Sequence, residues 1–279
     1  MFRYIPDNAA PPKPGDDRDR MNTGTTHRRD RLADGRCVII KRKPDAPSGF
    51  FASEARGLAT LRDARALRVP EVHAVDAYHI VLEDLGAGER AMDYWRLAGV
   101  GLAKQHAVAG ASFGFGHDGY CGDSPQDNTP DVDGWRFFAE RRLLPQARRA
   151  RDDDLIDSSD IAAIERLCAQ LRERVPDMPP VLLHGDLWSG NLHVCADGSP
   201  ALIDAGAVHY GWAEAELAML ILFGSPPPAF FEAYADHAPL RGDWRERAPL
   251  YNLYHLLNHV NLFGASYMAS LRAALAVCA

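Results

Sequence analysis

The sequence predicts an α+β fold of two lobes, a small antiparallel sheet with one helix followed by a larger, mostly helical lobe. Short strands and a single helix fill the chain up to Leu82–Gly86, where a strand ends in a glycine-containing crossover typical of a hinge. Beyond it, apolar residues recur with helical period, most clearly in Ser158–Val175 and Leu250–Phe263. We therefore expect a flexible N-terminal arm over 1–20, a first lobe over 21–85 and a second lobe over 86–279.

In the first lobe, a lysine and a glutamate are placed to form an ion pair. The strand Cys37–Lys41 follows a hairpin turn, and its alternation directs Lys41 to the same face as apolar neighbours. The helix expected over Gly49–Ala64 carries Glu54 in the middle of its apolar stripe. A carboxylate is costly there unless a cation pairs with it, so we predict a Lys41–Glu54 pair rather than two solvated side chains.

The stretch Val181–Asp204 groups two carboxylates and an amide around one point. Val181–Leu183 is a short apolar run that predicts a buried strand ending just before Asp186. Asp197-Gly198 then predicts a two-residue hairpin, which pairs residues whose numbers sum to 395 and so places Asn191 opposite Asp204. Grouped oxygen ligands of this kind suit Mg²⁺ and leave room for phosphate.

Three motifs carry a resemblance to a known family. Asp186 and Asn191 have the spacing of the catalytic loop of kinases, within the longer string HGDLWSGN. The segments YG..E.ELAM and LYHLLNH.NLFG follow in order. Together they resemble the fructosamine (ketosamine) kinase family, in the aminoglycoside phosphotransferase-like branch of the protein-kinase-like fold. The similarity covers roughly Leu32–Tyr267 and implies ATP-dependent phosphorylation of a sugar-derived hydroxyl, on a small molecule or a glycated amine such as a ribulosamine.

The resemblance also implies roles for residues. Asp186 would accept or orient the proton of the acceptor hydroxyl, and Lys41, held by Glu54, would contact the phosphates of ATP. Asn191 and Asp204 would hold Mg²⁺, while His184 would brace the loop by bonding the backbone near Asp204. The backbone of the expected hinge would hold the adenine, through Glu83, Asp84 and Leu85.

Candidates for the acceptor side are less specific. Trp188 protrudes from the catalytic loop and could pack on a sugar ring or belong to the core, and Tyr210 lies in the second motif. His255 and His259 share a polar helix face that suits a hydroxyl-rich ligand or equally a packed loop. Their spacing is that of metal ligands, but no HExxH pattern accompanies it, so we do not expect zinc from this pair. The loop 113–133 is a candidate substrate lid.

Two departures from the family pattern keep other functions open. Met21–Thr26 retains one glycine where the family has a Gly-Gly phosphate loop, and one extra residue follows Asp204. A kinase of another hydroxylated metabolite or an aminoglycoside is one alternative. A nucleotide-binding pseudokinase, motivated by the reduced glycine loop, is another.

Composition limits the partners. The 279-residue chain has a net charge of −7, which argues against broad binding of nucleic acids. Five cysteines without a C-x-x-C pair predict free thiols in a reducing cytoplasm. The apolar run Leu217–Phe223 is too short to cross a membrane. We expect a cytoplasmic monomer or weak dimer.

Overall fold

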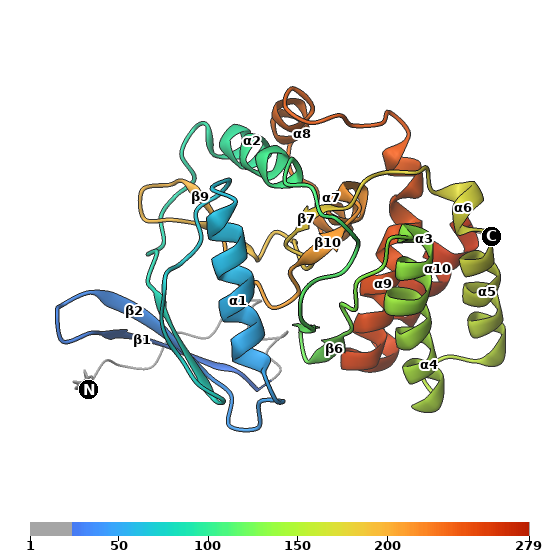
Figure 1. Cartoon of the computed structure of the whole chain (residues 1–279), viewed down its shortest axis with the longest axis horizontal. Helices are drawn as coiled ribbons and strands as arrows, with labels where there is room; N and C mark the ends of the chain where they lie inside the picture. The colour runs from blue at the N-terminus through green and yellow to red at the C-terminus, as the bar shows by residue number, and fades with distance from the viewer. Residues whose placement is uncertain (1–23, 279) are drawn as a thin grey trace.

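A computed structural model describes residues 24–278 and shows two lobes, a small one built on a sheet and a larger helical one (Figure 1). The expected α+β, protein-kinase-like architecture is confirmed. The arm predicted over 1–20 lies outside the described residues, as do the first three positions of Met21–Thr26.

The small lobe is a four-stranded antiparallel sheet in the order β1-β2-β4-β3. Its strands are β1 Thr26–Arg31, β2 Cys37–Arg42, β3 Val72–Val75 and β4 His79–Glu83. The sequence did not predict β1, because its charged residues hide the alternation of a strand. It forms as an edge strand whose backbone pairs with β2 along its whole length, from Thr26 opposite Arg42 to Arg31 opposite Cys37.

Helix α1, Phe50–Asp63, packs on this sheet and agrees with the predicted helix. Phe51, Leu58 and Leu61 are buried on its inner face. Glu54 lies on the same face and is only 6% exposed. The helical phase read from the sequence therefore brings a carboxylate into the interior of the small lobe.

The large lobe consists mostly of helices. They are α2 Tyr94–His106, α3 Gly134–Phe138, α4 Leu144–Asp152, α5 Ser158–Ala169, α6 Leu171–Arg174, α7 Ala213–Leu222, α8 Pro228–Ala235, α9 Trp244–Phe263 and α10 Met268–Cys278. Three two-stranded pairs complete it, β5 Gly119–Cys121 with β6 Ser124–Gln126, β7 Val181–Leu183 with β10 His209–Gly211, and β8 Leu192–Val194 with β9 Pro200–Leu202. In Figure 1 the pair β7–β10 lies in the middle of the molecule, and β9 lies beside the upper end of α1, below α2.

Two prolines lie within helical segments. Pro145 lies in the first turn of α4, where its missing N–H costs no helical hydrogen bond, directly after a π-helical turn over Ala139–Leu143 that joins α3 to α4. Pro249 was expected in the first turn of a helix starting at Leu250, but α9 begins at Trp244. Trp244 is 1% exposed and its ring packs on Phe231, so burial of this indole stabilises the additional turn.

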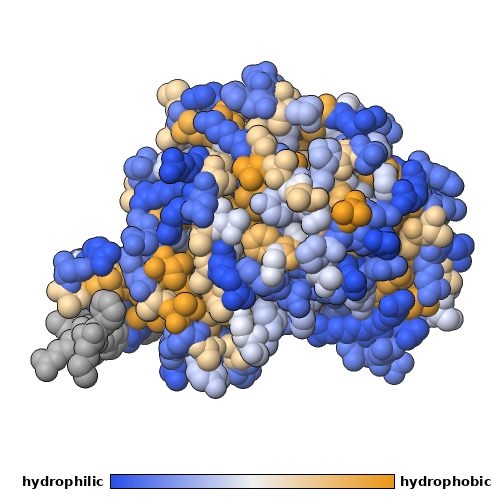
Figure 2. All heavy atoms as spheres, viewed as in Figure 1, coloured by the Kyte–Doolittle hydropathy of each residue, from blue (hydrophilic) through white to orange (hydrophobic). Residues whose placement is uncertain are grey.

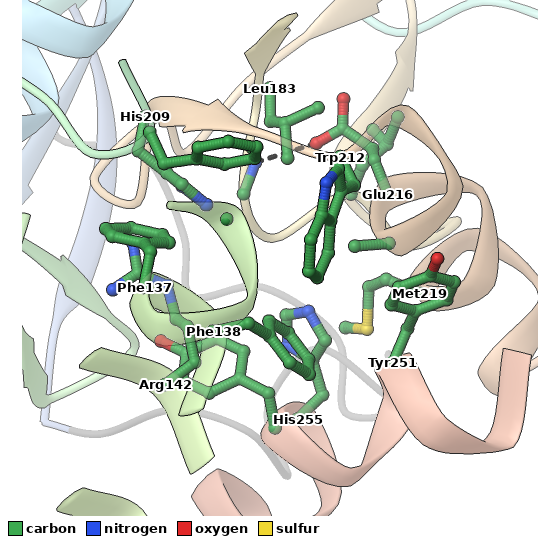
Figure 3. Close-up of a pocket in the computed structure, with 17 residues that line it drawn as sticks. Phe137, Phe138, Arg142, Leu183, His209, Trp212, Glu216, Met219, Tyr251 and His255 are labelled. Atoms are coloured by element: carbon green, nitrogen blue, oxygen red, sulfur yellow. Dashed lines mark hydrogen bonds between the residues drawn. The ribbon is translucent and has the colours of Figure 1, made fainter. Parts of the chain in front are cut away.

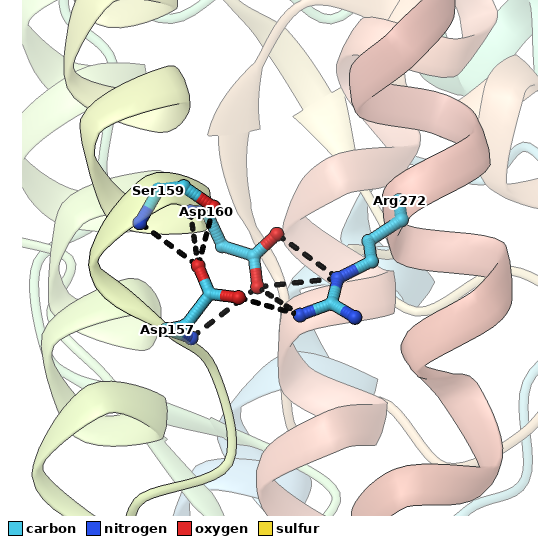
Figure 4. Close-up of polar contacts among 4 residues, drawn as sticks. All are labelled: Asp157, Ser159, Asp160 and Arg272. Atoms are coloured by element: carbon cyan, nitrogen blue, oxygen red, sulfur yellow. Dashed lines mark hydrogen bonds and ion pairs between the residues drawn. The ribbon is translucent and has the colours of Figure 1, made fainter.

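Helix α5 begins with a capping box and is tied to the C-terminal helix. The Asp157 carboxylate accepts the N–H groups of Ser159 and Asp160, and Asp160 returns a bond to the N–H of Asp157. Arg272 of α10 donates to both Asp157 and Asp160 (Figure 4). This contact joins elements more than a hundred residues apart.

The outer surface shows mostly hydrophilic residues, with apolar ones in small scattered groups on the face in Figure 2. The helical stretch Trp244–Cys278 is, by length and composition alone, apolar enough to cross a membrane. The prediction from the sequence rested on the shorter run Leu217–Phe223 and did not include this stretch. One such stretch is weak evidence, since core helices pass the same test, and α9 buries Asn252, Asn258 and His259 among its neighbours.

Candidate active site

Strand β7 delivers the catalytic-loop motif to the junction of the lobes. All three residues of β7 are buried, and His184 directly after it is fully enclosed. The His184 Nε2–H donates to the carbonyl of Ile203 at 2.8 Å, and its Nδ1 accepts the N–H of Asp186 at 3.4 Å. The bracing contact expected of His184 is confirmed, and it fixes Asp186 relative to the strand that ends beside Asp204.

The Asp186 carboxylate is half-buried at the end of this loop. Burial raises the pKa of Asp186, while the neighbouring His184 and His259 act in the opposite direction. The loop is closed from the other side by Asn191, whose Nδ2 donates to the carbonyl of Asp186 at 2.8 Å. Contacts to the loop's backbone thus fix the position of Asp186, and the Cys121 thiol lies beside its carboxylate.

The hairpin after Asn191 has a different register from the predicted one. β8 pairs with β9 so that paired residue numbers sum to 394, as in Leu192 opposite Leu202. The turn contains three residues: the Gly198 N–H bonds the Cys195 carbonyl at 2.8 Å, and Gly198 has a left-handed φ of 82°. This is a type I turn followed by a bulge at Gly198, in place of a two-residue turn. The backbone partner of Asn191 is therefore Ile203, whose N–H donates to the Asn191 carbonyl at 3.2 Å, and not Asp204.

Asp204 follows directly in an unusual backbone conformation. Its φ is 61°, in the left-handed region that costs a non-glycine residue of order 1–3 kcal/mol and persists where surrounding structure imposes it. The Asp204 side chain is 42% exposed. The Oδ1 of Asn191 accepts no hydrogen bond from any described residue. An amide oxygen and an open carboxylate are oxygen donors of the kind that Mg²⁺ prefers, so these two residues fit a magnesium ion.

One lysine connects the two lobes at this point. Lys41 Nζ lies 2.5 Å from the Glu54 Oε1 and also contacts the Asp204 carboxylate. The Lys41 and Glu54 side chains are 9% and 8% exposed. The structure thus brings Lys41, Glu54 and Asp204 together in one charged group. The contact between Lys41 and Glu54 is the ion pair predicted from the apolar stripe of α1.

Helix α1 rests directly on the segment after Asp204. A Cβ added at Gly57 would lie 1.9 Å from the carbonyl oxygen of Ala205, so this helix position admits glycine alone without a backbone shift. Gly57 lies one turn after Glu54 and couples that residue to the Asp204 segment. The sequence already indicated a close contact at this position, because a glycine inside a helix costs about 1 kcal/mol of stability and usually has a packing or functional reason.

The residues expected to form the hinge lie where β4 leaves the sheet. The Glu83 carboxylate pairs with Arg68 at 2.7 Å, and Asp84 pairs with Arg29 at 2.6 Å, so both side chains are used in the small lobe. The Leu85 side chain packs on Cys195 and Ala201 of the hairpin. Within the described chain, the N–H of Leu85 has no hydrogen-bond partner and remains available to a ligand.

Glu216, in the first turn of α7, is a buried carboxylate that supports the loop. The Glu216 Oε1 accepts the N–H of Gly185 at 2.7 Å, while its Oε2 accepts from Gln105 and His106, each at 3.1 Å. Burial acts to raise the pKa of Glu216, but these hydrogen bonds, led by that from His106, hold it below its usual value. Glu216 on α7 therefore positions the residue that precedes Asp186.

Replacing Glu216 with glutamine is expected to lower the free energy of unfolding at pH 7 by about 1–3 kcal/mol, because one amide N–H must face another donor. A depressed carboxyl pKa stabilises the fold above the unfolded value of roughly 4.3, and this contribution is lost as the pH falls below it. Urea denaturation at a series of pH values should therefore show that the difference in free energy of unfolding between wild type and Glu216→Gln becomes smaller as the pH falls. Glu232→Gln, at an exposed position of α8, is the control. A difference in free energy of unfolding that does not change with pH would contradict the proposed contribution of the Glu216 carboxylate.

The four candidate acceptor residues have different surroundings. Trp188 is half-buried, with its indole against Gly190 in the catalytic loop. Tyr210 is also half-buried and packs near Gly110 and Phe115. His259 lies among three aromatic rings, Phe223, Phe263 and Tyr267, whereas His255 lies within 4.8 Å of Asp186.

The segment 113–133 is a packed part of the site and not a loose lid. Cys121, Gln126 and Asn128 are each at most 2% exposed. The Tyr120 N–H bonds the Gly206 carbonyl at 3.0 Å, and Gln126 Nε2 bonds that of Ala207 at 3.0 Å. Through β5 and β6, the segment is fastened to the residues that follow Asp204. Sequence reasoning missed it because its glycines, aspartates and prolines resemble a loop.

A cavity of about 30 Å³ lies inside the large lobe, with room for one or two waters. Figure 3 shows Phe137, Trp212, Met219 and His255 around it. Gly185 and Leu187 line it, but Asp186 between them does not. The guanidinium of Arg142 is buried in its wall, and burial lowers the pKa of His255 to about 3, so that imidazole is neutral at pH 7. This cavity backs the catalytic loop and does not open onto Lys41.

Comparison with known proteins finds relatives of one family. A family model described as fructosamine kinase matches residues 7–278. A probable ketoamine kinase of Synechocystis is 39% identical over 82% of this chain and 78% of its own. A chloroplastic protein-ribulosamine 3-kinase of Arabidopsis thaliana is 34% identical over 85% of this chain and 74% of its own.

Solved structures agree with the fold. A crystal structure from Thermobifida fusca, assigned as a fructosamine-3-kinase, superposes with a TM-score of 0.86 at 37% identity, over 92% of this chain and 90% of that one. A macrolide 2′-phosphotransferase has the same fold with a TM-score of 0.61 at 16% identity, over 92% of this chain and 88% of that one.

Proposed function

Because the chain belongs to the fructosamine kinase family, we propose that it transfers the γ-phosphoryl group of ATP to a hydroxyl of a ketosamine or ribulosamine, with Asp186 as the residue that accepts the hydroxyl proton. The observation that carries this proposal is the chain of contacts around one point. Asn191 bonds the Asp186 backbone, and Lys41 joins Glu54 to Asp204.

Phosphoryl transfer needs positioning and charge neutralisation more than covalent chemistry. Lys41 supplies a cation for the ATP phosphates, and Glu54 holds its ammonium group in place. The backbone of Glu83–Leu85 receives the adenine. The unpartnered N–H of Leu85 supports this part of the proposal, because it is free to donate to a ring nitrogen. Asn191 and Asp204 would hold Mg²⁺, which when bound would neutralise phosphate charge.

On the acceptor side, Asp186 orients the hydroxyl and takes its proton as the oxygen–phosphorus bond forms. Trp188 offers a half-buried flat surface at the loop for a sugar ring, and His259, buried among aromatic rings on α9, supports that side of the site. His255 is close enough to Asp186 to contact the same substrate. Tyr210, half-buried beside Phe115, stays a candidate for contact with the acceptor.

A screen of acceptors tests the proposal. ADP release should be stimulated by fructosamines or ribulosamines of lysine and not by free lysine, the unmodified sugars or aminoglycosides. A preference for an aminoglycoside would replace the proposed substrate class. Binding of Mg·ATP in a thermal-shift assay without transfer to any acceptor in single-turnover assays would support the pseudokinase alternative instead.

The free cysteine thiols indicate the compartment in which the reaction takes place. All five cysteines are unpaired in the structure, three of them buried. Such a set persists in a reducing compartment, and we infer that the protein acts in the cytoplasm on a soluble glycated amine.

A further inference from the structure

A thiol, an imidazole and the proposed catalytic carboxylate converge beside the site. One ligand atom each of Cys121, Asp186 and His255 lie within 4.8 Å of one another. They come from three separate parts of the chain: β5, the loop after β7, and α9. Cys121 is 2% exposed and His255 is 6% exposed, so two of the three groups are held inside the protein.

Packing alone leaves polar atoms of this cluster without partners. His255 Nδ1 is buried and has no hydrogen-bond partner among the described residues. Asn258, one turn along α9 from His255, donates to the Cys121 carbonyl at 3.1 Å and to its sulfur at 3.4 Å, while its own Oδ1 is also buried and unpartnered. Buried polar atoms are normally satisfied, so the polar groups on this side of the cluster are incompletely paired by the protein itself.

The donor set selects the kind of ion. Thiolate, imidazole and carboxylate are the ligands of Zn²⁺, and three protein ligands with a fourth open position are typical of zinc sites exposed to substrate. From the usual bond lengths, ligand atoms around tetrahedral zinc lie roughly 3.3–3.6 Å apart. A separation of at most 4.8 Å therefore closes with side-chain movements of about 1 Å. Mg²⁺ prefers oxygen donors alone and would select Asn191 and Asp204 instead.

We propose that Cys121, Asp186 and His255 form a Zn²⁺ site, and that zinc bound there inhibits the enzyme by coordinating the Asp186 oxygen that would otherwise accept the hydroxyl proton. On binding, the Cys121 S–H bond breaks, its proton passes to solvent, and a zinc–sulfur bond forms. The inhibitory half of this inference rests on the proposed role of Asp186. The site differs from the His255–His259 pair considered from sequence, because His259 Nδ1 is bonded to the His255 carbonyl at 2.6 Å.

Absorption spectroscopy with Co²⁺ as the probe tests the site without any kinase assay. The full chain, reduced and free of metal, should bind one equivalent of Co²⁺ with a thiolate-to-cobalt charge-transfer band that Zn²⁺ abolishes. Cys121→Ser should lose the band, and His255→Gln should weaken cobalt binding by at least about tenfold. Cys168→Ser, a half-buried thiol on α5, is the matched control and should keep it. Thermal melts establish that each variant is folded. No band in wild type, or a band that survives in Cys121→Ser, would overturn the site.

Inhibition is then measured with buffered Zn²⁺ at saturating Mg·ATP, relative to the zinc-free rate of each variant. Wild type should lose activity, extra Mg²⁺ should not restore it, and Cys121→Ser should need at least about tenfold more zinc. Equal zinc sensitivity of the two proteins would overturn the inhibitory role. If no acceptor is ever phosphorylated, the proposed function fails, while the cobalt band still decides whether the metal site exists.

Discussion

Replacing Asp186 with asparagine should lower turnover by about 10²–10⁴-fold and leave the binding of Mg·ATP nearly unchanged. Asparagine has the shape of aspartate but cannot accept the hydroxyl proton. The loop should keep its conformation, because Asn191 bonds the backbone carbonyl at position 186 and His184 bonds its N–H, neither of which the substitution alters. Turnover is measured by ADP release with the best acceptor of the screen, and nucleotide binding by thermal shift.

The control for this substitution is Asp236→Asn, which makes the same change of charge at an exposed residue after α8. It should leave both measurements at the wild-type level. A wild-type rate in Asp186→Asn would show that another group takes the proton. Loss of Mg·ATP binding in that variant would instead place Asp186 on the nucleotide side of the site.

Replacing Lys41 with methionine should lower kcat/KM for ATP by about 10²–10³-fold, the usual cost of removing a positioned group that stabilises developing charge. It should also destabilise the protein by up to about 3–5 kcal/mol, because Glu54 is then buried without its cation. Lys41 is in contact with two carboxylates, so its removal leaves Glu54 and Asp204 close together and unneutralised. Kinetics and urea denaturation measure the two effects.

A double variant separates the two roles of Lys41. Glu54→Met added to Lys41→Met removes the orphaned carboxylate, so stability should recover in part while activity does not. Lys104→Met, at an exposed position of α2, is the control and should change neither. Recovery of activity together with stability would mean that Lys41 acts through folding alone and not on the phosphates.

Several elements of the site could be predicted because their cause is local. The apolar period of α1 placed Glu54 on the inner face, and the alternation of β2 turned Lys41 toward it. The apolar run before His184 predicted the buried strand β7 that carries the loop. The helical period expected from Ser158 agrees with α5, which begins at Ser158.

Other elements could not be read in this way. Strand β1 has charged residues at nearly every position, and only its pairing with β2 identifies it. The hairpin at Gly198 admits two turn types from its residues, and the choice between them moved the register by one position. Glu216 has the sequence signature of a first-turn acid, yet its hydrogen-bond partners lie on α2 and on the catalytic loop.

The sequence by itself determined the lobes, the family, and the set of charged and amide residues that we propose for phosphoryl transfer, because motifs and periodicity act over a few residues. Only the tertiary structure decided which groups surround Asp186. Cys121 reaches it through β5 and His255 through α9, across separations in the chain that no spacing rule spans. The physical reason is that burial and contact between distant segments depend on packing of the whole chain, whereas helical phase, strand alternation and turn chemistry are set by neighbours.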